Sequence, residues 1–138
     1  MIKIQKKDFN IETEISDIKK NKSNIGAVNT FIGYVRDLNN NKDVKFIELE
    51  VYNEMAVKEL SKIKNNAIKK WSLIDCLIIH RYGKLSVSDK IVLVACFSEH
   101  RDKSFKACQY IMDYLKKDAP FWKKEHYKLG SDWLKNIS

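Results

Sequence analysis

Two lysine pairs on either side of the only proline are the residues of this sequence best suited to chemistry. The pairs are Lys116-Lys117 and Lys123-Lys124, and the large apolar rings of Phe121 and Trp122 lie between them. Desolvation beside such rings lowers the pKa of a lysine, and a neutral lysine can act as a base or a nucleophile at neutral pH. The structural alternative is a helix whose final lysines complement its dipole, followed by a proline stop and an amphipathic strand.

A second candidate site lies at His100 and Arg101, where a predicted strand ends and a predicted helix begins. Free backbone N–H groups and the helix dipole favour an anion at such a place. The two side chains would add charge-assisted donors to the same anion. A capped helix with an exposed basic residue explains the pattern equally well, so both interpretations stay open.

A third candidate is Arg36, which follows Tyr34 and Val35 at the end of a predicted strand. Binding residues are commonly mounted where a rigid strand gives way to a loop. Arginine supplies only three of the 26 basic residues, so each guanidinium is a candidate for bidentate anion recognition. The alternative is a solvated Arg36 that pairs with Asp37.

Helix geometry separates two of these candidates. Lys116 lies at the end of the predicted helix that Arg101 begins, and the rise of 1.5 Å per residue puts them about 22 Å apart along its axis. Either the ligand is extended, or two copies of the chain build one site, as symmetric homo-oligomers do.

Hydrophobic periodicity predicts the elements that must position these residues. Alternating or continuous apolar runs indicate strands, and apolar residues three and four positions apart indicate helices. Strands are predicted at residues 2–6, 25–35, 44–52, 74–81, 90–98 and 122–127, and helices at 11–18, 55–71 and 101–116. This order favours an α+β fold with a mostly antiparallel or mixed sheet, in a single domain over residues 1–138.

Several finer expectations follow from the same patterns. The strands 25–35 and 90–98 are predicted to be central, with Gly33 marking a bulge or a close backbone approach. Loops are expected at 36–43 and 85–89, and a turn or short helix at 130–134. The expected helix caps are Asp8 or Asn10 for the first helix and Ser98 or Asp102 for the last. His80 and Arg81 close a buried strand and are interpreted as structural.

Composition limits the class of protein. The chain is 44% hydrophobic and 32% charged, and its formal net charge is +8. The lysines are spread along the chain. This pattern predicts solubility and is only weak evidence for nucleic-acid binding. The three cysteines lack metal or redox spacing and are expected to be buried free thiols, which suits a reducing cytoplasm. Neither a signal peptide nor a transmembrane run is recognisable, and no metal site is expected.

The motifs, in this order, resemble those of the large, catalytic subunit of molybdopterin synthase. The matching runs include Thr30-Phe31-Ile32-Gly33-Tyr34-Val35-Arg36-Asp37, Ser98-Glu99-His100-Arg101 and, above all, Ala119-Pro120-Phe121-Trp122-Lys123-Lys124-Glu125. The resemblance implies an α/β hammerhead-like fold with an additional α+β subdomain. It also implies an enzyme without a cofactor that transfers sulfur to cyclic pyranopterin monophosphate and forms the dithiolene of molybdopterin. The sulfur donor would be the C-terminal thiocarboxylate of a small ubiquitin-like partner ending in Gly-Gly, bound at each end of a homodimer.

The resemblance also assigns roles to individual residues. Lys116 and Lys123 match the two catalytic lysines of the family. The implied substrate-binding residues are Tyr34, Val35, Arg36, His100, Arg101, Lys124 and Glu125. The chain departs from the family at Tyr34, where a basic residue is common, and at Asn40-Asn41, where the loop often carries a glycine.

The rival interpretation is a non-enzymatic basic module that binds RNA or an acidic protein. Its support is the net charge of +8, and it predicts an affinity that falls steeply with salt. The enzyme interpretation predicts instead conversion of the pyranopterin precursor, capture of a small protein's C-terminal tail, and no binding of nucleic acid or membrane.

Overall fold

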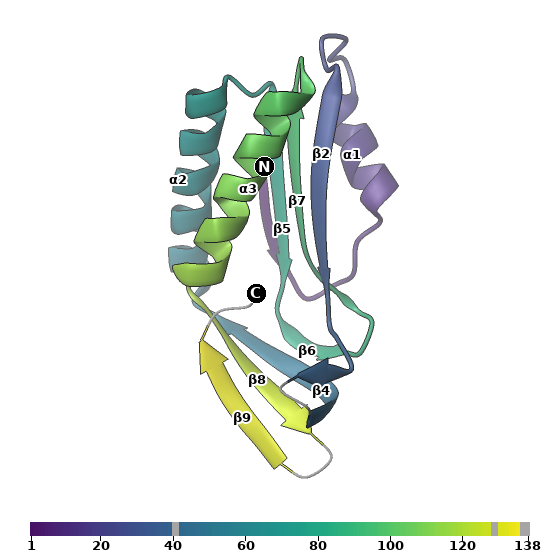
Figure 1. Ribbon diagram of the computed structural model, residues 1–138, viewed down its shortest axis with the longest axis vertical. Helices are drawn as coiled ribbons and strands as arrows, with labels where there is room; N and C mark the ends of the chain where they lie inside the picture. The colour runs from purple at the N-terminus through teal and green to yellow at the C-terminus, as the bar shows by residue number, and fades with distance from the viewer. Residues whose placement is uncertain (40–41, 128–129, 136–138) are drawn as a thin grey trace.

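The computed structural model describes residues 1–39, 42–127 and 130–135, and the statements below concern these residues. They form two sheets and three helices (Figure 1). The helices are α1 (Ile11–Lys19), α2 (Asn53–Trp71) and α3 (Arg101–Lys117). The strands are β1 (Ile2–Gln5), β2 (Ala27–Tyr34), β3 (Leu38–Asn39), β4 (Lys42–Val51), β5 (Asp75–Arg81), β6 (Gly83–Ser86), β7 (Lys90–Ser98), β8 (Phe121–Tyr127) and β9 (Gly130–Lys135). The predicted α+β class with a mixed sheet is confirmed.

The first sheet has the strand order β1-β5-β7-β2. Only the β1–β5 pair is parallel. Helices α2 and α3 cover one face and α1 covers the other (Figure 1). The core is therefore divided in two, because alternate residues of β5 and β7 point to opposite faces. Ile78 and Val94 pack under α2 and α3, whereas Leu77 and Leu93 pack under α1.

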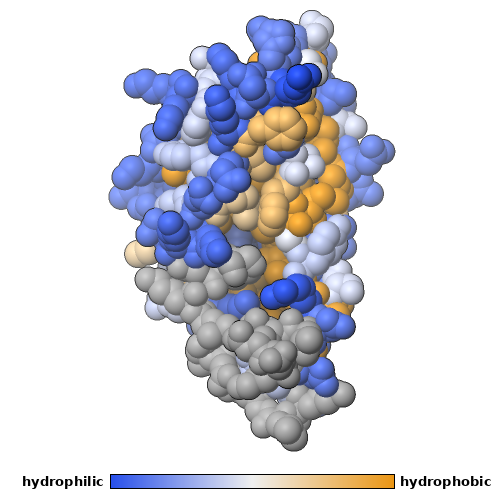
Figure 2. All heavy atoms as spheres, in the orientation of Figure 1, coloured by the Kyte–Doolittle hydropathy of each residue, from blue (hydrophilic) through white to orange (hydrophobic). Residues whose placement is uncertain are grey.

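The strand β7 is central as predicted, but the prediction that the strand at 25–35 is central is wrong. Among the described strands β2 lies at the edge of the first sheet and pairs only with β7. Its apolar residues Val28 and Phe31 are exposed, and apolar surface gathers over β2 and α3 in the space-filling view (Figure 2). Strand-forming composition indicates a strand, but it does not distinguish an edge that another surface can cover from an interior position.

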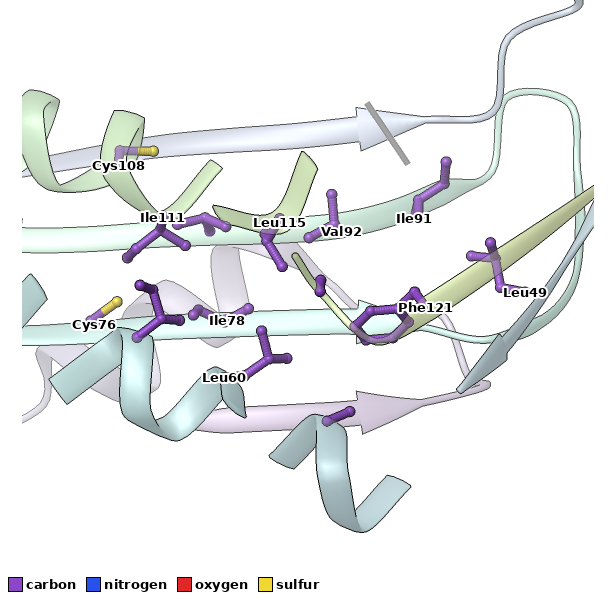
Figure 3. Packing of buried hydrophobic residues seen from close by; sticks show 14 of the residues in the cluster. Leu49, Leu60, Cys76, Ile78, Ile91, Val92, Cys108, Ile111, Leu115 and Phe121 are labelled. Atoms are coloured by element: carbon purple, nitrogen blue, oxygen red, sulfur yellow. The ribbon is translucent and has the colours of Figure 1, made fainter. Parts of the chain in front are cut away.

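All three cysteines are buried free thiols, as expected. Cys76 of β5 lies opposite Cys96 of β7, and Cys96 also interacts with Cys108 of α3. Cys76 and Cys108 both belong to the hydrophobic cluster drawn in Figure 3. Hydrogen bonding with Cys108 and Cys76, together with burial, raises the pKa of Cys96. All three thiols are at most 4% exposed, so they pack as small core side chains.

The second sheet has the order β3-β4-β8-β9, and β6 also pairs with β4. Two predictions are wrong here. Residues 83–86 form a strand where the 85–89 loop was expected to begin, and residues 130–135 form β9 where a turn or helix was expected. The predicted 36–43 loop contains the short strand β3, and Asn40 and Asn41 lie outside the described residues. These short strands form because β4 and β8 offer them backbone partners, which local periodicity does not reveal.

The N-terminal caps of the helices agree only in part with those predicted from the sequence. Asn10 caps α1 as predicted, because its side chain accepts a hydrogen bond from the Thr13 N–H at 2.9 Å. The capping prediction for α3 is wrong. His100 occupies the N-cap and makes no side-chain capping bond, since β7 continues to Ser98 and the Ser98 hydroxyl donates instead to the His100 carbonyl.

The apolar stripe of α2 is buried as predicted, with Ala56, Leu60 and Ala67 completely shielded from solvent. No helix of the described residues combines the length and the apolar character that crossing a membrane requires.

Candidate active site

The lysine-rich stretch is divided by a buried turn between α3 and β8. Lys116 lies in the last turn of α3, and its side chain is exposed. The chain then passes through Ala119, which is buried, and the Phe121 N–H donates to the Ala119 carbonyl at 2.8 Å. The predicted helix end followed by a fixed turn and an extended segment is therefore confirmed.

The two candidate catalytic lysines lie in different surroundings. Lys116 is exposed, whereas the Lys123 side chain retains only 15% of its accessible surface. The two rings between them are engaged elsewhere, since Phe121 stacks on His80 and Trp122 meets Tyr52 edge-on. The predicted desolvation of both lysines by Phe121 and Trp122 is therefore wrong for Lys116 in this chain.

Lys123 has a buried carboxylate beside it. Its Nζ lies 3.4 Å from Glu125 Oε2, and the Tyr127 hydroxyl donates to Glu125 Oε1 at 2.6 Å. Glu125 is only 3% exposed. Successive side chains of a strand point to opposite faces, so those of residues 123, 125 and 127 in β8 lie on the same face. Lys124 leaves the opposite face and is half-buried.

A small cavity lies beside this stretch, where β2 and α3 end and β8 begins. Its lining comes from Phe31, Gly33, Tyr34, His80, Ile91, Val92, Met112, Leu115 and Phe121. Tyr34 is 51% exposed at the rim, and Arg36, two residues later, is also exposed. The tertiary structure thus brings the end of β2, the Lys116 end of α3 and the Lys123 strand to one region.

The end of β2 is held by its backbone. The Val35 N–H donates to the Asp89 carbonyl at 2.9 Å, and the Val35 carbonyl accepts from Ser88 N–H at 2.8 Å. The strand register shifts between Gly33 and Tyr34, and a Cβ at Gly33 would lie 3.0 Å from Val92 Cγ1. The predicted bulge and close approach at Gly33 are both confirmed. Val35 itself is 4% exposed, so its side chain belongs to the core.

His100 and Arg101 lie at the other end of α3, and both are exposed. The segment before them is fixed against Gly26, whose N–H donates to the Ser98 carbonyl at 3.0 Å. A Cβ at Gly26 would lie only 2.1 Å from the Glu99 carbonyl oxygen, so glycine is required there. Within one chain, the structure therefore separates His100 and Arg101 from Lys116.

His80 and Arg81 have structural contacts, as predicted. The Arg81 guanidinium donates to the Lys6 and Lys90 carbonyls at 3.1 and 3.0 Å. The His80 ring lies 3.7 Å from the Phe121 ring, and burial lowers the pKa of His80 to about 4. Neutral His80 therefore forms part of the cavity wall, a position that the sequence pattern did not reveal.

Met112 and Tyr127 also lie at this site, and the sequence pattern did not single them out as functional. Met112 lines the cavity, and its position one helical turn before Lys116 was the available signal. Tyr127 contacts Glu125, and the alternation 123, 125, 127 along a predicted strand could have found it.

Comparisons with known proteins identify the family to which the chain is similar. Residues 4–118 match the family described as MoaE protein. The chain is 49% identical to the molybdopterin synthase catalytic subunit of Ralstonia nicotianae over 133 residues, which are 96% of this chain and 76% of that protein. These matches support the same fold and the same type of enzyme.

Solved structures resemble the chain closely. The molybdopterin synthase of Staphylococcus aureus has a TM-score of 0.89 at 32% identity, covering 97% of this chain and 96% of that one. A complex of subunits 1 and 2 of molybdopterin-converting factor from Helicobacter pylori shares the fold, with a TM-score of 0.81 at 18% identity over 99% and 92% of the two chains. The chain therefore belongs to the MoaE family of molybdopterin synthase catalytic subunits, enzymes of the sulfur-transferring step in molybdopterin biosynthesis.

Proposed function

We propose that this chain transfers sulfur from the C-terminal thiocarboxylate of a small ubiquitin-like partner to cyclic pyranopterin monophosphate, so that two transfers form the dithiolene of molybdopterin. The observation that carries the proposal is that Leu115 of α3, Tyr34 of β2 and Phe121 of β8 line one cavity. Lys116, Arg36 and Lys123 follow these residues within two positions along the chain. Both reactants are anions, and three cationic side chains from separate elements suit them.

Each lysine has a role that fits its surroundings. Lys116 is exposed and can meet an incoming tail, so it orients the partner's C-terminal carbonyl and sulfur. Lys123 is half-buried beside the Glu125 carboxylate, so it moves a proton as the cyclic phosphate opens and sulfur adds. Arg36 would bind the substrate's anionic group from the end of β2, and Lys124 would contact the same ligand.

The proposal of a small partner subunit is supported by a solved complex with the same fold. A Helicobacter pylori protein with this fold was solved as a complex of two subunits of molybdopterin-converting factor. For the present chain we expect a small subunit whose Gly-Gly tail passes Lys116 to reach the cavity. A narrow tail without side chains suits a site bordered by Tyr34 and Leu115.

A second copy of the chain completes the proposed site. His100 and Arg101 lie at the start of α3 and Lys116 at its end, about 22 Å away along a rigid helix. A homodimer in which one copy's His100 and Arg101 face the other copy's Lys116 would supply the missing phosphate donors. The three buried free thiols suit a reaction in the reducing cytoplasm.

The test is a sulfur-transfer assay with the pyranopterin precursor and a thiocarboxylated partner. The wild type is expected to form the dithiolene, and Lys123→Ala is expected to lose roughly 100-fold or more in rate, as for removal of a general acid–base group. Wild-type protein without conversion, or a Lys123→Ala variant with a near-normal rate, would contradict the proposal. An RNA-binding titration in the same buffer tests the basic-module alternative.

A further inference from the structure

Strand β8 presents an unusual set of side chains on its inner face. Phe121 and Glu125 on that face are 1% and 3% exposed. In the register with β4, Lys123 lies opposite Leu49 and Glu125 opposite Ile47, both of which are 2% exposed. A carboxylate is therefore embedded among core side chains, where ionised groups need close partners.

Tyr127 and Lys123 contact different oxygens of this carboxylate. Tyr127 O–H donates to Oε1 at 2.6 Å, and Lys123 Nζ lies 3.4 Å from Oε2. The shorter contact has the length of a strong, charge-assisted hydrogen bond. With one oxygen bound to a phenol on the same strand, the carboxylate cannot rotate freely, and the direction of its second oxygen is fixed.

We propose that Tyr127 is a positioning residue that holds Lys123 through the Glu125 carboxylate. Tyr127 orients Glu125, and Glu125 in turn holds the Lys123 ammonium in a fixed position on β8. This inference rests on the proposed role of Lys123 in sulfur transfer. It gives Glu125 an internal function, in place of the direct substrate contact that the resemblance implied.

The first test measures Lys123 directly, without any activity. Amine acetylation followed by mass spectrometry gives the labelling rate at Lys123, with the exposed Lys116 as the reference in the same molecule. Tyr127→Phe removes only the hydroxyl, and we expect Lys123 labelling to rise by up to roughly tenfold, the scale of one charge-assisted hydrogen bond. An unchanged Lys123 rate overturns the proposal.

The matched control is Tyr110→Phe. It makes the same chemical change on α3, where the Tyr110 ring meets Trp71 edge-on at 5.1 Å. Lys123 labelling and sulfur transfer should stay at the wild-type level in this variant, because its hydroxyl lies outside the Lys123 network. A rise of Lys123 labelling in Tyr110→Phe equal to that in Tyr127→Phe would overturn the specific role of Tyr127.

The second test separates kcat from KM in the sulfur-transfer assay. Tyr127→Phe is expected to lower kcat about tenfold with little change in the KM of the precursor, because it acts through a misplaced lysine. A raised KM at normal kcat would overturn the proposal by making Tyr127 a binding residue. A wild type that transfers no sulfur overturns the proposed function, and the labelling result still decides the positioning.

A double-mutant cycle completes the design. Glu125→Gln should raise the labelling rate at Lys123 more than Tyr127→Phe does. The double variant should have the same labelling rate as Glu125→Gln alone, because Tyr127 is proposed to act only through Glu125. Additive effects of the two substitutions on the Lys123 labelling rate would overturn the proposal that Tyr127 acts through Glu125. If Glu125→Gln does not fold, the result with Tyr127→Phe still decides.

Discussion

The two ends of helix α3 both carry exposed basic residues, but the chain segments that adjoin them differ. At its start, Arg101 follows His100, an N-cap without a side-chain hydrogen bond, and both side chains face solvent. At its end, the chain after Lys116 turns into a buried segment and continues as β8, beside a cavity. In the proposed function, the first end binds an anion with its backbone N–H groups and basic side chains, whereas the second end supplies the reacting lysine.

The difference indicates a division of labour along one rigid element. A helix cannot bend its two ends towards one small ligand, so under the proposed function a single chain would offer only one of these two ends to a given substrate. The exposed apolar edge at β2, between these ends, is where another surface can join them (Figure 2).

The largest expected effect separates the two ends by kinetics. Lys116→Ala should lower kcat by about 100- to 1,000-fold, the range for loss of a preorganised electrostatic group. Arg101→Ala should mainly raise the KM of the precursor, because it removes a ligand to an anionic group. The control is Lys69→Ala, an equally exposed lysine in the last turn of α2. Equal losses of kcat at both ends would contradict the division.

Mixing two impaired variants, at a precursor concentration well below the KM of Arg101→Ala, tests whether the ends meet in a dimer. If one site takes Lys116 from one copy and Arg101 from the other, a Lys116→Ala chain and an Arg101→Ala chain restore one intact site in each mixed dimer. Random exchange of equal amounts should then recover about a quarter of the wild-type rate. Recovery is measured after subunit exchange, and either variant mixed with itself is the control. No recovery, with exchange verified, would place both groups in one chain's site.

Gly26, just before β2, and Gly33, near the end of β2, provide a smaller, structural test. Gly26→Ala puts a Cβ 2.1 Å from the backbone oxygen of Glu99, whereas Gly33→Ala puts one 3.0 Å from the movable side chain of Val92. Gly26→Ala should therefore cost about 1–3 kcal/mol of unfolding free energy and displace His100, and Gly33→Ala should cost less. Urea unfolding measures both. A larger loss of unfolding free energy in Gly33→Ala than in Gly26→Ala would contradict the conclusion that the backbone contact between Gly26 and Glu99 fixes the segment before Arg101.

The smallest expected effect is a pH dependence from His80, at the Lys116 end. Burial lowers its pKa in the folded protein to about 4, while the unfolded chain has the ordinary value of 6.5. As the pH falls from 7 to 5, the unfolded state takes up the proton and the folded state does not, so this contribution lowers stability by about 2 kcal/mol. His80→Phe, which keeps a ring beside Phe121, should flatten this slope in urea titrations. An unchanged slope would mean that His80 is protonated in the fold.

The sequence pattern predicted the elements that have strong local signals. Periodicity identified α2, β5 and β7, because each buries a regular set of apolar residues that the chain order already displays. It did not identify β6 and β9, because a four- to six-residue strand depends on partners that lie far away in the sequence. The edge position of β2 was missed for the same reason.

The sequence by itself determined the residue types of the site and their places along α3 and β8, including the separation of Arg101 from Lys116. Only the tertiary structure decided that Lys123 is shielded and Lys116 exposed, and that Glu125 and Tyr127 hold the shielded lysine. Helical rise and strand alternation are properties of the local chain, so a sequence displays them directly. Burial and ion pairing depend on which strands lie side by side, and the register of β8 with β4 places Lys123 and Glu125 opposite the buried residues Leu49 and Ile47.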